Sequence, residues 1–347
     1  MNYLGLAFIV LGTCNSLFSS QVEKKILTVK GAIDATEMGT TLIHEHVLVD
    51  FGGADVTGYH RWNREDVLQV VLPHVLEVKS RGMKTLFEMT PAYLGRDPLL
   101  LSRLSEKSDL HLITNTGFYG ARNNKFIPHF AFEASADELS EIWIDEFENG
   151  IEGTDIRPGF IKIAVDRDPQ LSTMHAKIVR AAGMTHLATG LTIVSHTGPD
   201  EPAFAQLELL KSMGVDPSAF VWTHAQWGTM DGYLRAIEMG AWVSIDNVAD
   251  VKLSNQRFSN RIDWFVWVLS ELKKHDALHR VLISHDAGWY RVQETEEKPY
   301  RGYTAIFDRL IPALKKVGFG QEDIDRLLIY NPQEAFKIRK RSFSNHP

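Results

Sequence analysis

The sequence predicts an α/β fold, a closed (β/α)8 TIM barrel with a metal site at the C-terminal ends of its strands. Eight short apolar segments alternate with segments of helical period, as in a series of βαβ units. Six side chains that are able to bind metals lie near the ends of the apolar segments. No Gly-x-Gly-x-x-Gly turn follows any of these segments, which weakens the competing open, doubly wound sheet.

The predicted strands are short runs rich in apolar and β-branched residues, as expected for strands of a buried parallel sheet. In order they cover residues 41–50, 83–90, 110–117, 159–165, 191–197, 220–225, 241–246 and 280–286. The helical segments cover residues 65–82, 98–109, 136–151, 173–190, 202–214, 231–240 and 261–275, followed by a final pair at 303–318 and 322–336. Several helices are expected to end at glycines in the C′ position: Gly82, Gly190, Gly214 and Gly240.

Composition indicates an ordinary globular chain. Of its 347 residues, 44% are hydrophobic and 23% are charged, and the formal net charge is −7. This charge argues against a nucleic-acid partner, which a basic surface would attract. The one short basic run, at 337–341, is interpreted as a solvated terminal helix. No interdomain linker or tandem repeat is evident, so residues 21–347 are predicted to form a single domain.

The N-terminal segment has the character of a signal peptide. Residues 3–12 are mostly apolar, too short a run to span a bilayer, and small residues follow them. Residues 1–20 are therefore predicted to be a signal peptide of a secreted or periplasmic protein, with a disordered or packed N-terminal extension as the alternative. Cys14 allows a lipoprotein anchor, which Thr13 disfavours. Cleavage before Gln21 would leave a mature chain without cysteine and hence without disulfides.

Histidines and one aspartate mark the ends of several predicted strands. His44 and His46 are two residues apart and therefore share one face of their strand. His196, His224 and Asp286 each end an apolar run. Singly, these residues are typical of a surface strand, of hydrogen-bonded structural histidines and of a helix cap. Together they would meet at the barrel face where such enzymes carry catalytic groups, which favours a metal site.

Lys162 lies within the apolar run 160–165. A charged lysine is costly in a buried strand, so the residue requires either a buried ion pair or a chemical modification. Burial favours the neutral amine, which can react with carbon dioxide. The resulting Lys162 carbamate would be an anionic oxygen pair able to bridge two cations.

Several motifs resemble those of the phosphotriesterase-like family of the amidohydrolase superfamily, from about Val29 to Phe336. They are LIHEH at 42–46, GFIKIA at 159–164, SHTG at 195–198, His224, SHDAG at 284–288 and Asn331-Pro332 followed by Phe336. The resemblance implies two divalent metal ions, with Zn²⁺ as the expected metal. It implies that His44, His46 and Asp286 hold the more buried ion, and that His196 and His224 hold the more exposed one. Carbamylated Lys162 and a hydroxide would bridge the pair.

Such a site implies hydrolysis. Imidazole suits zinc, and two ions about 3.5–4 Å apart lower the pKa of a bridging water toward about 7. We therefore expect hydroxide to attack an ester-type bond of a small-molecule substrate: a carboxylic ester, a lactone or an organophosphate triester. Lys162 and Asp286 are the expected catalytic residues, with Asp286 accepting the proton. The alternatives are an amide hydrolase and a metal-binding module without turnover.

Some positions depart from the family pattern. Phosphotriesterases often carry an acidic residue shortly after the histidine that corresponds to His224, whereas this chain has Ala225, Gln226 and Trp227 there. Asn247 stands where phosphotriesterases carry His and the related lactonases carry Arg. Tyr119 matches a loop position that is similar to that of lactonases, although a loop-packing role is the alternative. Trp289 and Arg291 lie in a loop after the last strand that is either a pocket wall or a solvated surface. Tyr119, Trp227, Trp289 and Arg291 are the predicted substrate-pocket residues. The resemblance also suggests a homodimer.

Overall fold

A computed structural model describes residues 24–249, 251–253, 257–293 and 300–343. The predicted signal peptide, residues 1–20, lies outside these ranges, so export stays a prediction. No helix in the described ranges is long and apolar enough to cross a bilayer.

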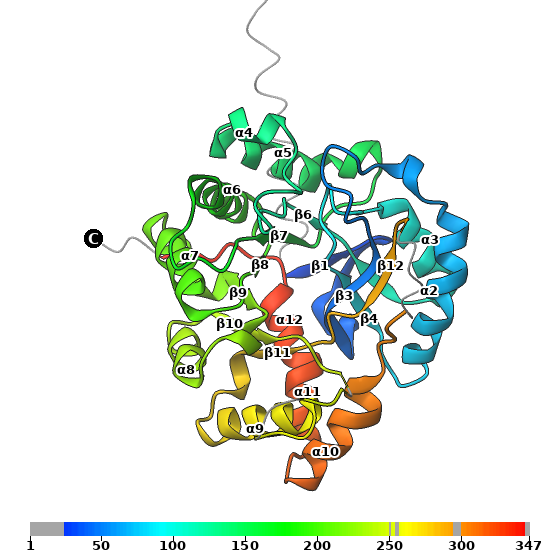
Figure 1. Cartoon of the computed structure of the whole chain (residues 1–347), viewed down its shortest axis with the longest axis vertical. Coiled ribbons are helices and arrows are strands. Elements are labelled where there is room, and N and C mark those ends of the chain that lie inside the picture. Colours follow the sequence, from blue (N-terminus) through cyan, green and yellow to red (C-terminus); the bar gives the residue numbers. More distant parts are fainter. Residues whose placement is uncertain (1–23, 250, 254–256, 294–299, 344–347) are drawn as a thin grey trace, which may run out of the picture.

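Parallel strands form a (β/α)8 barrel (Figure 1). In ring order they are β3 (Thr41–Val49), β4 (Thr85–Glu88), β5 with β6 (His111–Ile113 and Asn115–Thr116), β7 (Phe160–Ala164), β8 (Ile193–His196), β9 (Phe220–Thr223), β10 (Trp242–Ile245) and β11 (Val281–Ile283). Backbone hydrogen bonds from Asp286 N–H to His44 O (3.0 Å) and from His46 N–H to Ala287 O (2.8 Å) join the end of β11 to β3. The predicted fold and all eight predicted strands are confirmed. An additional strand that we did not predict, β12 (Gly288–Arg291), continues alongside β3.

Helices surround the strands (Figure 1). They are α2 (Arg64–Lys79), α3 (Pro98–Ser108), α4 (Phe130–Glu133), α5 (Ala136–Asn149), α6 (Thr173–Thr189), α7 (Asp200–Ser212), α8 (Met230–Glu238), α9 (Arg261–Lys274), α10 (Ile311–Lys316), α11 (Gln321–Asp325) and α12 (Asn331–Phe336). Most of the long helices begin where a side-chain oxygen accepts a hydrogen bond from a backbone N–H of the first turn. These N-caps are Asn63, Asp97, Ser135, Ser172, Thr229 and Asn260.

The final helical pair is less regular than predicted. A π-helical turn occupies Ile306–Leu310 before α10, and a second occupies Arg326–Tyr330 before α12. Each π turn ends two residues before a proline, Pro312 or Pro332. Proline lacks an N–H and its ring clashes with the carbonyl four residues earlier, so the preceding turn widens.

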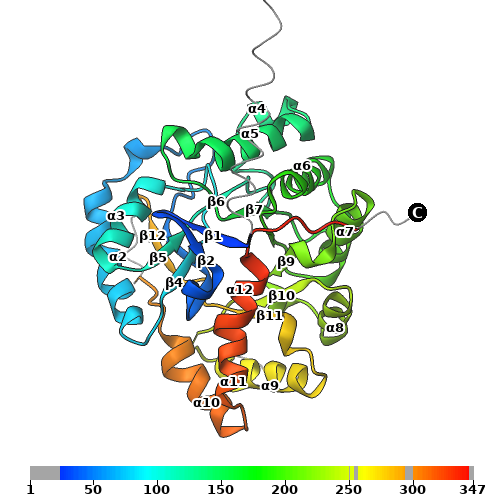
Figure 2. The ribbon, with the colours of Figure 1, turned by 180° about the vertical axis from the view of Figure 1, so that it is seen from behind.

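The N-terminal end of the barrel is plugged. The hairpin of β1 (Lys25–Thr28) and β2 (Gly31–Asp34) lies there with α12 (Figure 2). Phe336 of α12 is 1% exposed, and its ring centroid lies 4.3 Å from that of Phe87 and 6.0 Å from that of Phe160. Asn331 Nδ2 donates to the carbonyls of Leu278 and Val281, 2.7 Å each, which anchors α12 to the barrel. The open end is therefore the one where the strands terminate.

The basic run at 337–341 is not the solvated helix that we expected. The helix ends at Phe336, and the chain then runs in non-helical form beneath the barrel. Arg341 is only 5% exposed and donates to Thr192 Oγ1 (3.0 Å) and to Ala335 O (3.0 Å). Its guanidinium binds carbonyls that α12 leaves free at its C-terminus, and this interaction draws the arginine inward.

Candidate active site

A cavity of about 150 Å³ opens at the C-terminal ends of the strands. The four histidines, Lys162 and Asp286 line it together, as do Tyr119, Trp227 and Trp289. Arg291 is not among the lining residues; its guanidinium lies 5.1 Å from the ring centroid of Trp289. The other lining residues, which the sequence analysis did not single out, are Val49, Phe51, Leu94, Arg122 and Phe126.

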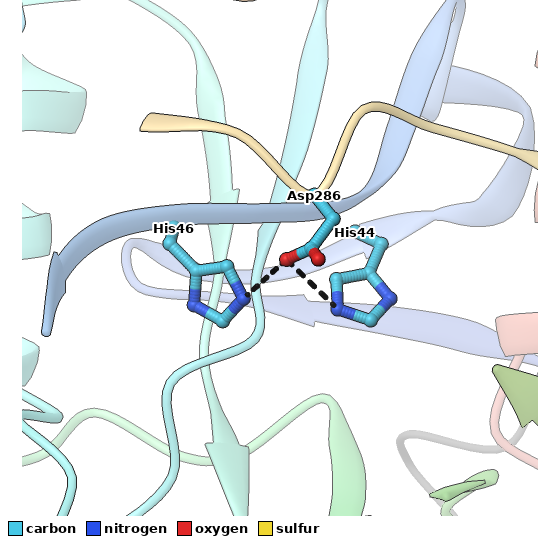
Figure 3. Close-up of side chains that lie close together, drawn as sticks. All are labelled: His44, His46 and Asp286. Carbon is cyan, nitrogen blue, oxygen red and sulfur yellow. Dashed lines mark ion pairs between the residues drawn. The ribbon is translucent and has the colours of Figure 1, made fainter. Parts of the chain in front are cut away.

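His44, His46 and Asp286 lie close together (Figure 3). Their ligand atoms lie within 4.8 Å of one another. One oxygen of Asp286 is 3.1 Å from His46 Nε2 and 3.8 Å from His44 Nε2. The two histidines point to the same side of β3 because side chains two residues apart in a strand share a face.

The residue between the two histidines holds the loop that carries Asp286. Glu45 is fully buried, and its carboxylate accepts from the N–H groups of His285 and Ala287 (3.0 Å each) and from Ser284 Oγ (2.7 Å). Position 288 must be glycine, because a Cβ there would lie 1.8 Å from the carbonyl oxygen of His46. Asp286 itself has a left-handed backbone, φ +50°, so its placement is imposed by this surrounding framework.

Asp246 orients two of the histidines. Its carboxylate lies 3.0 Å from His44 Nδ1 and 2.7 Å from His224 Nδ1. Although burial opposes ionisation, the His224 and His44 side chains hold the pKa of Asp246 well below its ordinary value. An ionised carboxylate only accepts, so both Nδ1 atoms carry the proton and both Nε2 lone pairs are free. Carboxylates that bind the outer nitrogen of a histidine in this way are characteristic partners of metal-ligating imidazoles.

The other two histidines also have fixed partners. His46 Nδ1 lies 2.8 Å from Thr90 Oγ1, and that hydroxyl donates to Leu48 O (2.9 Å). The hydroxyl therefore accepts from His46 Nδ1–H, and the Nε2 lone pair faces Asp286. His196 Nδ1 lies 3.2 Å from the Tyr119 hydroxyl. The four imidazoles are contiguous: ring centroids are separated by 5.6 Å from His46 to His44, 4.9 Å from His44 to His224, and 4.2 Å from His224 to His196.

These partners bring electron-pair donors face to face. The free Nε2 atoms of His44 and His46 both approach an oxygen of Asp286. Burial and the positive charge of Lys162 lower the pKa of His44 to about 4, so its imidazole is neutral at pH 7. Two imidazole nitrogens and a carboxylate oxygen at these separations repel one another unless a cation lies among them. The donor set therefore fits a divalent metal ion.

Lys162 is 2% exposed, and its Nζ has no hydrogen-bond partner in the described part of the chain. Burial lowers the pKa of Lys162 to about 8, against the attraction of Asp246, Asp286 and Glu88. An isolated buried ammonium is costly, so the amine is partly neutral and reactive here. The orphaned nitrogen fits the predicted carbamate, whose oxygens would face the same cavity.

Two supporting residues, Asp246 and Thr90, were given no role from the sequence, although both had a signal there. Asp246 is the last residue of the seventh predicted strand, AWVSID, just as histidines lie near the ends of other predicted strands. Thr90 is the last residue of the second predicted strand. Gln226 belongs to the segment that departs from the family pattern, and it binds Asp246 twice, through Nε2 to Oδ1 (3.3 Å) and through Oε1 to N–H (3.2 Å). Asn247 instead accepts from Arg261 at 2.6 Å and does not line the cavity.

Comparisons with known proteins agree with this geometry. The phosphotriesterase family model matches residues 24–336. The chain is 29% identical over 300 residues to the phosphotriesterase homology protein of Escherichia coli, covering 86% of this chain and 98% of that relative. It is 27% identical over 317 residues to an aryldialkylphosphatase of Saccharolobus solfataricus (88% and 98%) and 24% identical over 354 residues to an N-acetyltaurine hydrolase of Mus musculus (91% and 98%).

A solved structure has the same architecture. The organophosphorus hydrolase of Deinococcus radiodurans superposes with a TM-score of 0.79 at 26% identity, covering 91% of this chain and 97% of that one. Sequence motifs, fold and site geometry therefore lead to one conclusion: the chain belongs to the phosphotriesterase family.

Proposed function

We propose that the chain is a binuclear zinc-dependent hydrolase that cleaves an ester-type bond: a carboxylic ester, a lactone or an organophosphate triester. One observation carries the proposal: four histidines, the carboxylate of Asp286 and Lys162, whose amine has no hydrogen-bond partner in the described part of the chain, line a single cavity. When bound, two divalent ions would supply a nucleophilic water at neutral pH and polarise the substrate oxygen.

The residues of the chain have separate tasks in this proposal. Asp246 and Thr90 hold His44, His224 and His46 in the tautomer that presents Nε2. Asp286 presents a carboxylate oxygen that can take up the proton released when water attacks and pass it to the leaving group. Lys162 would be carboxylated: its neutral amine forms an N–C bond to carbon dioxide and releases a proton. The cavity walls of Phe51, Phe126 and Trp289 would exclude bulk water.

Amide hydrolysis is the second candidate, and a specific observation favours it. Relatives of 21–24% identity are named N-acetyltaurine hydrolase, and such a substrate contains an amide bond. An amine leaving group needs a proton donor, and Asp286, once protonated, is the group in the cavity that would supply it.

Metal content and matched substrates test the proposal. Elemental mass spectrometry on protein purified without chelators should find about two zinc ions per chain. Hydrolysis of 4-nitrophenyl acetate, 4-nitroacetanilide and diethyl 4-nitrophenyl phosphate is then compared, each rate divided by the uncatalysed rate. We expect the larger enhancement for the ester or the triester. A larger enhancement for the anilide would establish the amide hydrolase, and metal binding without any hydrolysis would indicate a binding module.

The variant Asp286→Asn tests the assigned proton acceptor. Removing a general base costs about 10²–10⁴-fold in rate, and we expect the loss in kcat to lie in that range. Asp200→Asn is the matched control, because Asp200 accepts from Thr229 outside the cavity. An unchanged kcat in Asp286→Asn would remove Asp286 from the mechanism.

A further inference from the structure

The cavity has a cationic rim that the proposed hydrolysis does not use. Arg122 lines the cavity, is solvent-exposed, and holds its guanidinium 5.1 Å from the ring centroid of Phe51. Arg167 is also exposed, and its guanidinium lies 3.7 Å from the ring centroid of Trp227, another lining residue. In the described part of the chain, neither guanidinium forms an ion pair. Arginines without a carboxylate partner beside a substrate cavity are free to bind an anion.

The backbone at Arg122 is held in an unfavourable conformation. Arg122, Asn123 and Asn124 have φ values of +61°, +56° and +60°. Asparagine tolerates this left-handed region, whereas a long side chain such as that of arginine is uncommon there. The Asp166 carboxylate holds the turn by accepting from Arg122 N–H (2.7 Å) and Asn123 N–H (3.2 Å). Residues that the surrounding structure holds in such a sparsely populated backbone conformation cluster at functional sites, so the position of Arg122 beside the cavity indicates a functional constraint.

The charge of the rim contrasts with that of the whole chain. The protein carries a formal net charge of −7, yet among the described residues that line the cavity Arg122 is the only cation besides Lys162. The remaining walls are largely aromatic or aliphatic, with Phe51, Leu94 and Phe126 among them. The cavity therefore suits a small molecule with an apolar body and one negative group at the rim.

We propose that Arg122, assisted by Arg167, forms an anion subsite that selects substrates carrying a carboxylate or sulfonate group remote from the scissile bond. The inference rests on the proposed hydrolytic function and adds a substrate class to it. The anionic group would accept hydrogen bonds from the guanidinium at the rim while the scissile carbonyl lies at the base of the cavity, near Asp286. Arg122 would thus be a specificity-determining residue rather than a catalytic one.

A matched substrate pair isolates the charge. The 4-nitrophenyl monoester of adipic acid carries a free carboxylate, and the corresponding ester of adipamic acid carries a neutral amide of nearly equal shape. We expect the ratio of kcat/KM, anionic over neutral, to fall about 10-fold in Arg122→Gln, the value of one charge-assisted hydrogen bond at a partly exposed site. Arg122→Lys should keep part of the preference, because it retains the charge without the planar donor pair. Arg167→Gln should lower the ratio by a smaller factor.

Arg235→Gln is the matched control. Its guanidinium also stacks on an aromatic ring, 4.0 Å from the centroid of Phe204, but it lies outside the cavity. The ratio should stay at the native value in this variant. A ratio within twofold of native in Arg122→Gln, with both esters hydrolysed, would overturn the anion subsite and leave the hydrolase intact.

Direct binding tests the anion subsite independently of the proposed hydrolysis. If neither ester is hydrolysed, the proposed function fails, but the subsite can still be tested by NMR titration of the purified protein. N-Acetyltaurine, a sulfonate, is compared with its neutral primary sulfonamide. Tighter binding of the sulfonate to the native protein than to Arg122→Gln supports the subsite. Equal affinities of both compounds for both proteins contradict it.

Discussion

Replacement of Asp246 by asparagine would test how the site is oriented. Oδ2 of Asp246 lies 3.0 Å from His44 Nδ1 and accepts from His224 N–H (3.0 Å) and Ser244 Oγ (2.9 Å). Oδ1 lies 2.7 Å from His224 Nδ1 and 3.3 Å from Gln226 Nε2. Asparagine offers a single acceptor oxygen, which would take the place of Oδ2, where the three donors from His44, His224 and Ser244 meet. Its NH₂ group would then face His224.

The consequence follows from the tautomer of His224. A donor opposite Nδ1 forces the proton onto Nε2, the atom that would otherwise bind a metal ion. Loss of an outer carboxylate partner costs about 10–100-fold in metal affinity, or about 1.4–2.7 kcal/mol. We expect this loss for one ion of the pair, the one bound by His224, because His44 keeps its acceptor.

Chelator competition on Asp246→Asn measures this loss, and ¹⁵N NMR of the histidine side chains in chelator-treated protein reports the tautomer. A merely structural role for Asp246 would lower the melting temperature without changing the tautomer of His224. Asp200→Asn serves as the control for the chemical change itself. Metal affinity within twofold of native, together with an unchanged His224 tautomer, would refute the reasoning.

Three further predictions concern stability. Phe336→Ala removes a ring packed on Phe87 and should lower the free energy of unfolding by about 3–5 kcal/mol. Phe343→Ala, at a 42% exposed position, should change it by less than about 0.5 kcal/mol. Equal effects of the two variants in denaturant titrations would contradict the packing of Phe336 at the closed end of the barrel. Burial lowers the pKa of His186 to about 4 from 6.5, so the unfolded chain binds more protons between these pH values, and stability should fall by about 3 kcal/mol as the pH drops from 6.5 to 4. His186→Gln lacks this titration, so the stability difference between the two proteins should shrink over that interval; a constant difference would show that His186 does not titrate abnormally. Removal of metal by a chelator should lower the melting temperature of the protein, and readdition of zinc with bicarbonate should restore it. The reason is that ions bound only by the folded state stabilise that state. An unchanged melting temperature after verified metal removal would contradict a metal bound in the native state.

The sequence by itself determined the order of the strands and the residue types at their ends. Short runs of apolar and β-branched residues predicted each barrel strand, because a buried parallel strand needs apolar side chains on both faces. Strand ends that carry His196, His224 and Asp286 predicted a shared site, because the C-terminal ends of parallel barrel strands converge. The spacing of His44 and His46 likewise fixed their common face.

Only the tertiary structure decided how these side chains are oriented. Asp246 acts across 22 residues on His224 and across 202 residues on His44, and no local pattern encodes such a pairing. Arg341 illustrates the same limit, since its basic neighbourhood predicted solvent exposure and long-range carbonyl acceptors buried it. The left-handed turn at Arg122 depends in turn on the distant Asp166 carboxylate. Periodicity reports which face of an element is buried, whereas hydrogen-bond partners that are distant in sequence exist only once the barrel has closed.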